Sequence, residues 1–148
     1  YLRGSFHMLN TSTNFDSLVY AVIEGISFGI KDGFDAVHSV SQKSKDIYFV
    51  GGGSKSDFWS DFMSSTLNEE VIVGEDSDLG PALGVARLAM LATNEYKNSD
   101  IIKNMRTVRK CIPSKKISNL LHDRYQRWRV IVDTNKTIAK KIMGNESE

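Results

Sequence analysis

The feature that most constrains the fold is a short, mainly apolar run, residues 46–50, that leads directly into three consecutive glycines, Gly51–Gly53. Such a run before a glycine turn is typical of a buried strand. Residue types that cap helices follow the turn, so a helix from there to about Leu67 is predicted. The chain must therefore change from strand to helix within a few residues. The candidate caps are Ser54, Ser56 and Asp57.

The preceding segment, residues 11–42, has the spacing of one long helix with a buried stripe, and Ser12 or Thr13 is its predicted N-cap. Gly25, Gly29 and Gly33 would each cost about 1 kcal/mol relative to alanine in such a helix. We therefore expect these glycines to admit another backbone or a ligand at close range. The stripe comprises Phe15, Leu18, Val19, Val22, Ile23, Ile26, Ile30, Phe34 and Val37.

The alternation continues after the glycine turn, with a second short strand at residues 71–73, a polar loop, and a third helix from Pro81 to about Thr93. Alternating helices and strands predict an α/β domain. Two short strands are too few for an independent sheet. Together with a first residue other than methionine, this indicates that the chain is part of a longer protein, with more of the sheet encoded elsewhere.

Four segments are expected along the chain. Residues 1–95 form the α/β portion, and residues 96–113 are a polar connector without a clear period. Residues 114–143 form an amphipathic helix that begins after Ser114, and residues 144–148 form a frayed tail.

Charge is distributed unevenly between the two parts of the chain. Residues 1–100 contain 7 Lys and Arg against 14 Asp and Glu, whereas residues 101–148 contain 12 against 4. The basic part indicates either contact with nucleic acid or anionic membrane, or a helix with a solvated charged face. The regular apolar spacing in that part favours the solvated helix. We therefore expect neither nucleic acid nor membrane as a partner.

Other classes of protein are disfavoured by what the sequence lacks. No apolar run approaches eighteen residues, no signal peptide is evident, and Cys111 is the single cysteine. No cluster of cysteine and histidine has the spacing of metal ligands. These features predict a soluble, cytoplasmic protein without a metal site in this chain.

The glycine turn is the main candidate for chemistry. At the start of a helix, unpaired backbone N–H groups and a positive dipole favour anions, and glycine lets a phosphate or nucleoside approach the backbone. The spacing matches neither a Walker loop nor a Rossmann fingerprint, and a purely structural tight turn explains the glycines equally well. The candidate nucleotide-binding residues are Gly51, Gly52, Gly53, Ser54, Lys55 and Asp57.

Several motifs, in order along the chain, resemble those of the FGGY family of carbohydrate kinases. GGGSKSDFW at 51–59 resembles the adenosine motif of that family, and GPALGVARLA at 80–89 is similar to a stretch typical of its xylulokinases. The further matching segments are RGSF at 3–6, AVIEG at 21–25, DGFD at 32–35 and YQRW at 125–128.

This resemblance implies a two-domain sugar kinase with an actin-like ATPase fold, of which the chain is the C-terminal part of an RNase-H-like domain. It further implies ATP and Mg²⁺ as cofactors and xylulose as the sugar, hence a role in xylose metabolism. The family's catalytic aspartate and sugar-binding residues lie upstream, so the chain contains no catalytic residue and is expected to be inactive alone. Gluconate, glycerol and ribulose remain alternative substrates, and a non-catalytic binding module with a basic tail is the alternative class. A homodimer is also compatible.

Carried over to this sequence, the resemblance implies that Gly52 and Gly53 contact the nucleotide through their backbone. Lys55 would neutralise phosphate charge or be merely solvated. Asp57 would accept a hydrogen bond from the adenine amino group or cap the helix. Gly84 would let the third helix lie close to the glycine turn.

Overall fold

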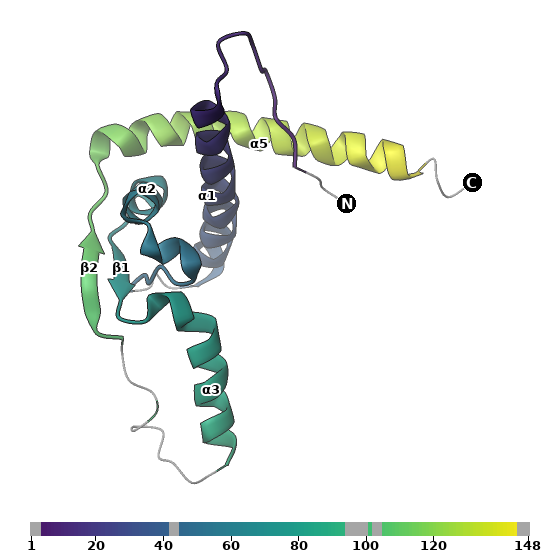
Figure 1. Cartoon of the computed structure of the whole chain (residues 1–148). Helices are drawn as coiled ribbons and strands as arrows, with labels where there is room; N and C mark the ends of the chain where they lie inside the picture. The colour runs from purple at the N-terminus through teal and green to yellow at the C-terminus, as the bar shows by residue number, and fades with distance from the viewer. Residues whose placement is uncertain (1–3, 42–44, 94–100, 102–104, 145–148) are drawn as a thin grey trace.

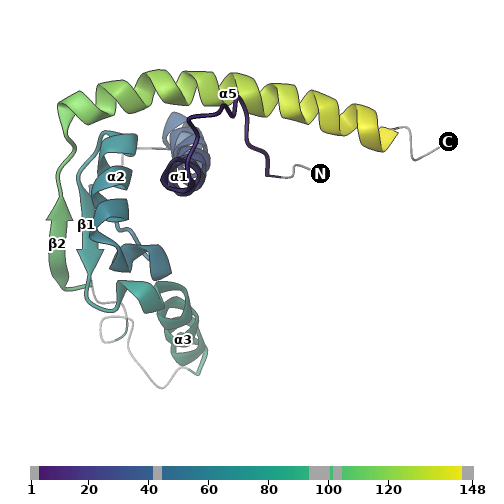
Figure 2. The ribbon, with the colours of Figure 1, turned by 45° about the horizontal axis from the view of Figure 1, so that its top comes forward.

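The computed structural model describes residues 4–41, 45–93, 101 and 105–144. Helix α5 runs across the end of α1, while α2 and the two strands lie beside α1 and α3 extends away from them (Figure 1). A turned view shows the C-terminal half of α5 projecting beyond the other elements (Figure 2). The elements are α1 (Phe15–Val40), the 3₁₀ turn η1 (Gly52–Lys55), α2 (Asp57–Leu67), β1 (Val71–Gly74), the 3₁₀ turn η2 (Ser77–Leu79), α3 (Gly80–Ala92), β2 (Thr107–Cys111) and α5 (Lys115–Gly144).

The long first helix is confirmed, but its predicted N-cap is wrong. The cap is Asn14, whose side chain accepts a hydrogen bond from the Ser17 backbone N–H at 2.9 Å. Ser12 and Thr13 instead belong to a turn organised by Asn10, whose side chain accepts from the Ser12 N–H at 2.9 Å and whose carbonyl accepts from the Thr13 N–H at 3.0 Å. Asn10 therefore holds Ser12 and Thr13 in a turn ahead of the helix, and neither residue caps it.

Helix α2 follows the glycine turn as predicted. The Ser56 side chain caps it by accepting from the Trp59 N–H at 3.2 Å, and Asn68 ends it in the left-handed conformation. Asparagine tolerates that conformation better than most residues, which explains a sharp end without glycine. Residues 62–67 of this helix are all buried, so α2 lies at the centre of the fold.

The sheet differs from the prediction. Strand β1 pairs antiparallel with β2, with Val71 opposite Cys111 and Val73 opposite Arg109. Strand β2 lies inside the segment predicted as a connector, residues 96–113, so that segment is more ordered than expected; residues 96–100 and 102–104 of it lie outside the described residues. The predicted strand at residues 46–50 is reduced to a parallel bridge between Tyr48 and Ile72.

The last two helices agree closely with the sequence. Helix α3 has Pro81 in its first turn, where the missing N–H is tolerated. Helix α5 begins at Lys115, directly after Ser114, and still includes Gly144. The predicted frayed tail otherwise lies outside the described residues. None of the helices in the described ranges is both long and apolar enough to cross a bilayer.

Two buried clusters hold these elements together. The first joins α1, α2 and α5, and the second joins α2 to the sheet. Two polar contacts reinforce the junction of α1 and α5. The Arg124 guanidinium lies 2.6 Å and 2.9 Å from the two carboxylate oxygens of Glu24, and the Tyr125 hydroxyl donates to Asp32 at 2.8 Å. The cluster residues are Phe28, Phe62, Leu121 and Tyr125 in the first and Met63, Leu67, Val71 and Cys111 in the second.

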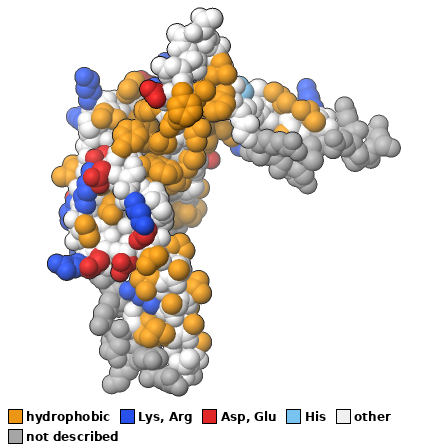
Figure 3. Space-filling view, viewed as in Figure 1, with side chains coloured by type: hydrophobic (Ala, Val, Ile, Leu, Met, Phe, Trp, Pro, Cys, Tyr) orange, Lys and Arg blue, Asp and Glu red, His pale blue; other side chains and the backbone are white. Residues whose placement is uncertain are grey.

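Large apolar surfaces remain outside these clusters. In the space-filling view, hydrophobic side chains gather over α1 and α2 and again over α3 (Figure 3). No residue of α3 is buried, although Val85, Leu88 and Met90 are large and apolar. Soluble monomers rarely expose contiguous apolar patches of this kind.

Candidate functional site

The glycine turn is positioned by the parallel bridge that precedes it. The Ile72 N–H donates to the Ile47 carbonyl at 2.8 Å, and the Phe49 N–H donates to the Ile72 carbonyl at 2.9 Å. The chain then reverses at Gly51, whose φ of 95° is the only positive glycine φ among the described residues. A side chain would be strained there, so the turn depends on glycine at this position.

A second loop, which contains η2, fastens the turn from the side. The Gly51 N–H donates to the Ser77 carbonyl at 2.7 Å, and the hydroxyls of Ser54 and Ser77 are hydrogen bonded to each other at 2.7 Å. Both serines are buried, with 4% and 6% of their surface exposed. Their hydroxyls therefore satisfy each other where water cannot, and the turn has a fixed shape.

The three glycines of the turn have different surroundings. A Cβ added to Gly53 would lie 2.9 Å from the Trp59 ring and 3.3 Å from the Phe49 ring, so packing alone demands glycine there. A Cβ on Gly52 would meet nothing within 4 Å. A Cβ on Gly51 would likewise meet nothing, but the positive φ of Gly51 already favours glycine, so Gly52 is the open position whose glycine the described residues do not explain.

The start of α3 approaches the turn through Gly80 rather than Gly84. A Cβ on Gly80 would lie 2.8 Å from the Val50 side chain, whereas one on Gly84 would meet nothing within 4 Å. The third helix therefore comes close to the glycine turn at Gly80, one helical turn before Gly84, and the expectation for Gly84 is wrong. The sequence contained the signal, since Gly80 directly precedes Pro81 at the start of that helix.

The two charged candidates are both engaged in ion pairs. The Lys55 ammonium lies 2.6 Å from the Asp78 carboxylate, and this hydrogen bond lowers the pKa of Asp78. The Asp57 carboxylate lies 2.7 Å from the Arg109 guanidinium, which also contacts Asp61 at 2.5 Å. Lys55 and Asp57 remain largely exposed, so both stay accessible to a ligand.

Sequence reasoning missed Ser77, Asp78 and Arg109. The first two lie in a segment that looked like an ordinary polar loop, and their proximity to the turn depends on the bridge between Tyr48 and β1. Arg109 lies on β2, which the sequence did not predict, and pairs with Val73 across the sheet. No local pattern signals such long-range contacts.

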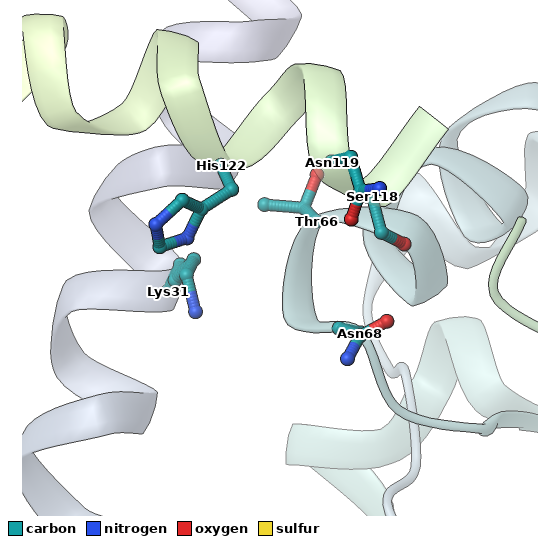
Figure 4. Close-up of a pocket in the computed structure, with 6 residues that line it drawn as sticks. All are labelled: Lys31, Thr66, Asn68, Ser118, Asn119 and His122. Atoms are coloured by element: carbon teal, nitrogen blue, oxygen red, sulfur yellow. The ribbon is translucent and has the colours of Figure 1, made fainter. Parts of the chain in front are cut away.

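A separate cavity of about 130 Å³ lies between α1, the end of α2 and the first turns of α5. Lys31 and His122 lie on one side of it, facing polar side chains from α2 and α5 (Figure 4). Because α2 has 11 residues, this cavity is about 16 Å along the helix from the glycine turn. It is therefore distinct from the nucleotide candidate. Its lining residues are Lys31, Thr66, Asn68, Ser118, Asn119 and His122.

In the described part of the chain, no three His, Cys, Asp or Glu side chains are grouped closely enough to hold a metal ion. Mg²⁺ is accordingly assigned to no residue in the described part of this chain. The backbone at Gly52, in contrast, is open to a ligand.

Comparison with known proteins decides the family. The model of the FGGY family of carbohydrate kinases, C-terminal domain, matches residues 1–93. The chain belongs to this family. This FGGY chain is 33% identical to the xylulose kinase of Escherichia coli over 96 aligned residues. The alignment covers 65% of this chain and 20% of that protein. The chain is 27% identical over 145 residues to the glycerol kinase of Haemophilus influenzae, covering 95% and 28%.

Solved structures show the same relationship. The crystal structure of a xyloylose kinase from Brucella ovis superposes with a TM-score of 0.77 at 29% identity, over 93% of this chain and 28% of that one. The predicted fold class is confirmed: the chain forms the C-terminal part of the α/β, actin-like ATPase domain of an FGGY kinase. It spans 20–28% of the length of these relatives.

Proposed function

We propose that this chain is the ATP-binding C-terminal part of a sugar kinase whose intact form transfers the γ-phosphoryl group of ATP to D-xylulose. Family membership supports a carbohydrate kinase. Xylulose kinases from several bacteria are among its relatives, which supports the choice of sugar. The adenosine end of ATP is placed at the turn Gly51–Gly53.

Adenosine is assigned to this turn because the turn has a fixed shape and its backbone is open. Ser77 fastens the turn, and no neighbour lies within 4 Å of the Cβ position of Gly52. A nucleoside can therefore lie directly against the main chain at Gly52, the first residue of η1, which precedes α2. The ligand meets a surface that needs no rearrangement, which reduces the entropic cost of binding.

Within the reaction, this chain binds and orients the nucleotide. Phosphoryl transfer depends mainly on positioning and on neutralising charge at the phosphates. Mg²⁺ supplies such neutralisation when it bridges phosphate oxygens, and the ligands for it are proposed to lie outside the described residues. The catalytic base and the sugar site are likewise placed upstream, so we expect no xylulose phosphorylation by this chain alone in a coupled ADP-release assay.

Gly52→Val tests the nucleotide site in the intact kinase. The added side chain would occupy the space proposed for adenosine, and we expect ATP to bind about tenfold more weakly or worse in titration calorimetry. Gly4→Val is the matched control, because its Cβ also meets nothing within 4 Å. Circular dichroism checks the fold. A folded Gly52→Val protein that binds ATP as tightly as the parent would leave only the structural explanation of the turn.

Glycerol is the second candidate substrate. Glycerol kinases align with 74–95% of this chain, whereas the xylulose kinases align with 57–66% of it. A panel of xylulose, glycerol, gluconate and ribulose with the intact kinase separates these alternatives. A higher kcat/KM for any of the other three would replace xylulose in the proposal.

A further inference from the structure

The cavity between α1, the end of α2 and the first turns of α5, which we call the polar cavity, is lined by six polar or basic side chains, none of them acidic. Its volume of about 130 Å³ corresponds to about four water molecules, which is enough for a small ion. Three of the lining side chains are largely buried and three are exposed, so a ligand can enter from solvent and still meet a buried wall. The buried members are Lys31, Thr66 and Ser118, and the exposed members are Asn68, Asn119 and His122.

The hydroxyl of Ser118 is buried and has no hydrogen-bond partner among the described residues, and the residue is only 8% exposed. Five other helical hydroxyls of this chain donate to the carbonyl four residues earlier. Ser118 makes no such bond, although its N–H donates to the Ser114 carbonyl at 2.8 Å. A buried polar group without a partner is unfavourable, so native proteins usually satisfy it with water or a bound ligand. The Ser118 hydroxyl is therefore available to a ligand in the polar cavity. The five hydroxyls that bond within their helices belong to Ser27, Ser60, Thr66, Thr134 and Thr137.

The Lys31 ammonium gives the polar cavity a positive charge. It donates to the Asp35 carboxylate, one turn later on α1, at 3.1 Å. An ammonium group has three N–H donors, so two remain for a ligand after this bond. Asp35 is not among the lining residues, and 46% of its side chain is exposed, so solvent screens its charge more than that of Lys31, which is 14% exposed. The charged group that faces the polar cavity is therefore a cation.

The two helix ends at the polar cavity have opposite effects on a charged ligand. Helix α5 begins there, and the positive end of its dipole favours an anion, whereas α2 ends there with its negative end. Each end is equivalent to about half a charge, so the two nearly cancel. The full charge of Lys31 therefore decides the sign. His122 lies on the same side of the cavity as Lys31, and its imidazole can donate a further hydrogen bond (Figure 4).

We propose that the polar cavity binds a phosphate, held by the Lys31 ammonium and the Ser118 hydroxyl. The donors belong to three separate segments, α1, α5 and the end of α2 at Asn68, and a tetrahedral oxyanion can accept hydrogen bonds from all three directions, whereas a carboxylate accepts in one plane. The phosphate is either free or the phosphoryl group of a small metabolite whose remainder extends toward the exposed side. This proposal does not depend on the nucleotide site, which lies at the other end of α2.

Titration calorimetry of the intact kinase with inorganic phosphate tests the polar cavity. A non-hydrolysable ATP analogue is present at saturation to occupy the nucleotide site, and its own binding is measured first, so the two sites can fail separately. The parent should bind phosphate saturably. Lys31→Met keeps most of the side-chain length but removes the charge, and should weaken phosphate binding by about tenfold or more. Methyl phosphate identifies the source: tighter binding than inorganic phosphate indicates a phosphorylated metabolite, and equal or weaker binding indicates free phosphate.

The matched control is Lys136→Met, which removes the same charge elsewhere. Lys136 is also paired with an aspartate of its own helix, Asp133, at 3.0 Å. It lies about 21 Å beyond His122 along α5, well over the screening length at ordinary salt. The phosphate affinity of this variant should therefore stay within about twofold of the parent.

Ser118→Ala separates a ligand contact from a purely structural role. Because the hydroxyl has no partner within the described residues, its removal should leave the melting temperature unchanged or raise it. The same variant should bind phosphate about fivefold more weakly. Three results would each overturn the proposal: no saturable phosphate binding by the parent, parent-like affinity in either Lys31→Met or Ser118→Ala, or an equal loss of affinity in Lys136→Met.

Discussion

Two groups of glycines, in the turn at residues 51–53 and in α1, differ in how far the described residues account for glycine. In the turn, Gly51 has a positive φ, and a Cβ on Gly53 would collide with the Trp59 ring. In α1, a Cβ on Gly25 would just touch Trp128 at 4.0 Å, and one on Gly33 would meet nothing.

The difference shows where each requirement for glycine originates. The turn needs glycine because of contacts inside this chain, and that need would exist without any ligand. Only Gly52 has no such internal reason, which makes it the informative position for nucleotide binding. No packing among the described residues requires glycine in α1 either. We therefore expect the glycines of α1 to serve contacts with residues outside the described part of the chain. The following predictions test this division.

The largest effect is expected where the two regions meet, at Trp59. Its ring packs against Gly53 and Phe49, and its Nε1–H donates to the buried Ser27 hydroxyl of α1 at 3.0 Å. Trp59→Ala should lower the free energy of unfolding by about 3–5 kcal/mol. Trp59→Phe keeps most of the ring and should cost about 1 kcal/mol for the lost hydrogen bond. Urea denaturation of both variants measures this, and equal losses would mean that the ring does not connect the regions.

The next largest effect is a pH dependence of stability that arises at Tyr125, where α5 packs against α1. Burial and the hydrogen bond to Asp32 raise the pKa of Tyr125 to about 12. Because the folded pKa lies above the unfolded value of about 10, the unfolded chain loses the proton first, and stability falls as pH rises between these values. The loss attributable to Tyr125 is about 2–3 kcal/mol. In Tyr125→Phe this part of the alkaline loss should disappear from chemical denaturation curves; an unchanged curve would contradict the contact.

Within the turn, Gly53→Val and Gly52→Val should differ clearly in their effect on the free energy of unfolding. The Gly53 substitution forces a side chain into the Trp59 ring and should cost about 1–3 kcal/mol of unfolding free energy. The Gly52 substitution meets open space and should change stability by about 0.5 kcal/mol or less. Thermal and urea unfolding of the isolated chain provide the comparison. If Gly52→Val were the more damaging of the two, the assignment of internal and external roles would be reversed.

The order of elements was predictable because local patterns determine it. The spacing of residues 15–37, the cap at Ser56 and the proline of α3 are signals contained in a few neighbouring residues. The sequence also predicted a ligand site at the glycine turn and further strands encoded outside the chain, and both stay predictions. Two of these local signals were misjudged, because Asn14 rather than a hydroxyl residue caps α1 and Gly80 rather than Gly84 approaches the turn.

What could not be predicted depends on contacts between distant segments. Strand β2 contains Thr107, Arg109 and Lys110, and its polar composition becomes a strand only through pairing with β1. The clamp of Arg109 on Asp57 follows from that pairing across 52 residues of sequence. Likewise, the ion pair of Lys55 with Asp78 requires η2 to fold back on the turn.

The smallest effect has the opposite sign from the others and concerns the glycines of α1. Since a Cβ on Gly33 meets nothing in the described residues, Gly33→Ala should gain helix propensity without a clash and stabilise the isolated chain by about 0.5–1 kcal/mol. Gly53→Ala in the turn is the matched comparison and should destabilise it, because the Cβ already lies 2.9 Å from the Trp59 ring. Urea unfolding of both alanine variants gives the two signs directly. If Gly33→Ala destabilised the isolated chain, glycine there would serve a contact inside the chain, and the distinction between the two groups of glycines would fail.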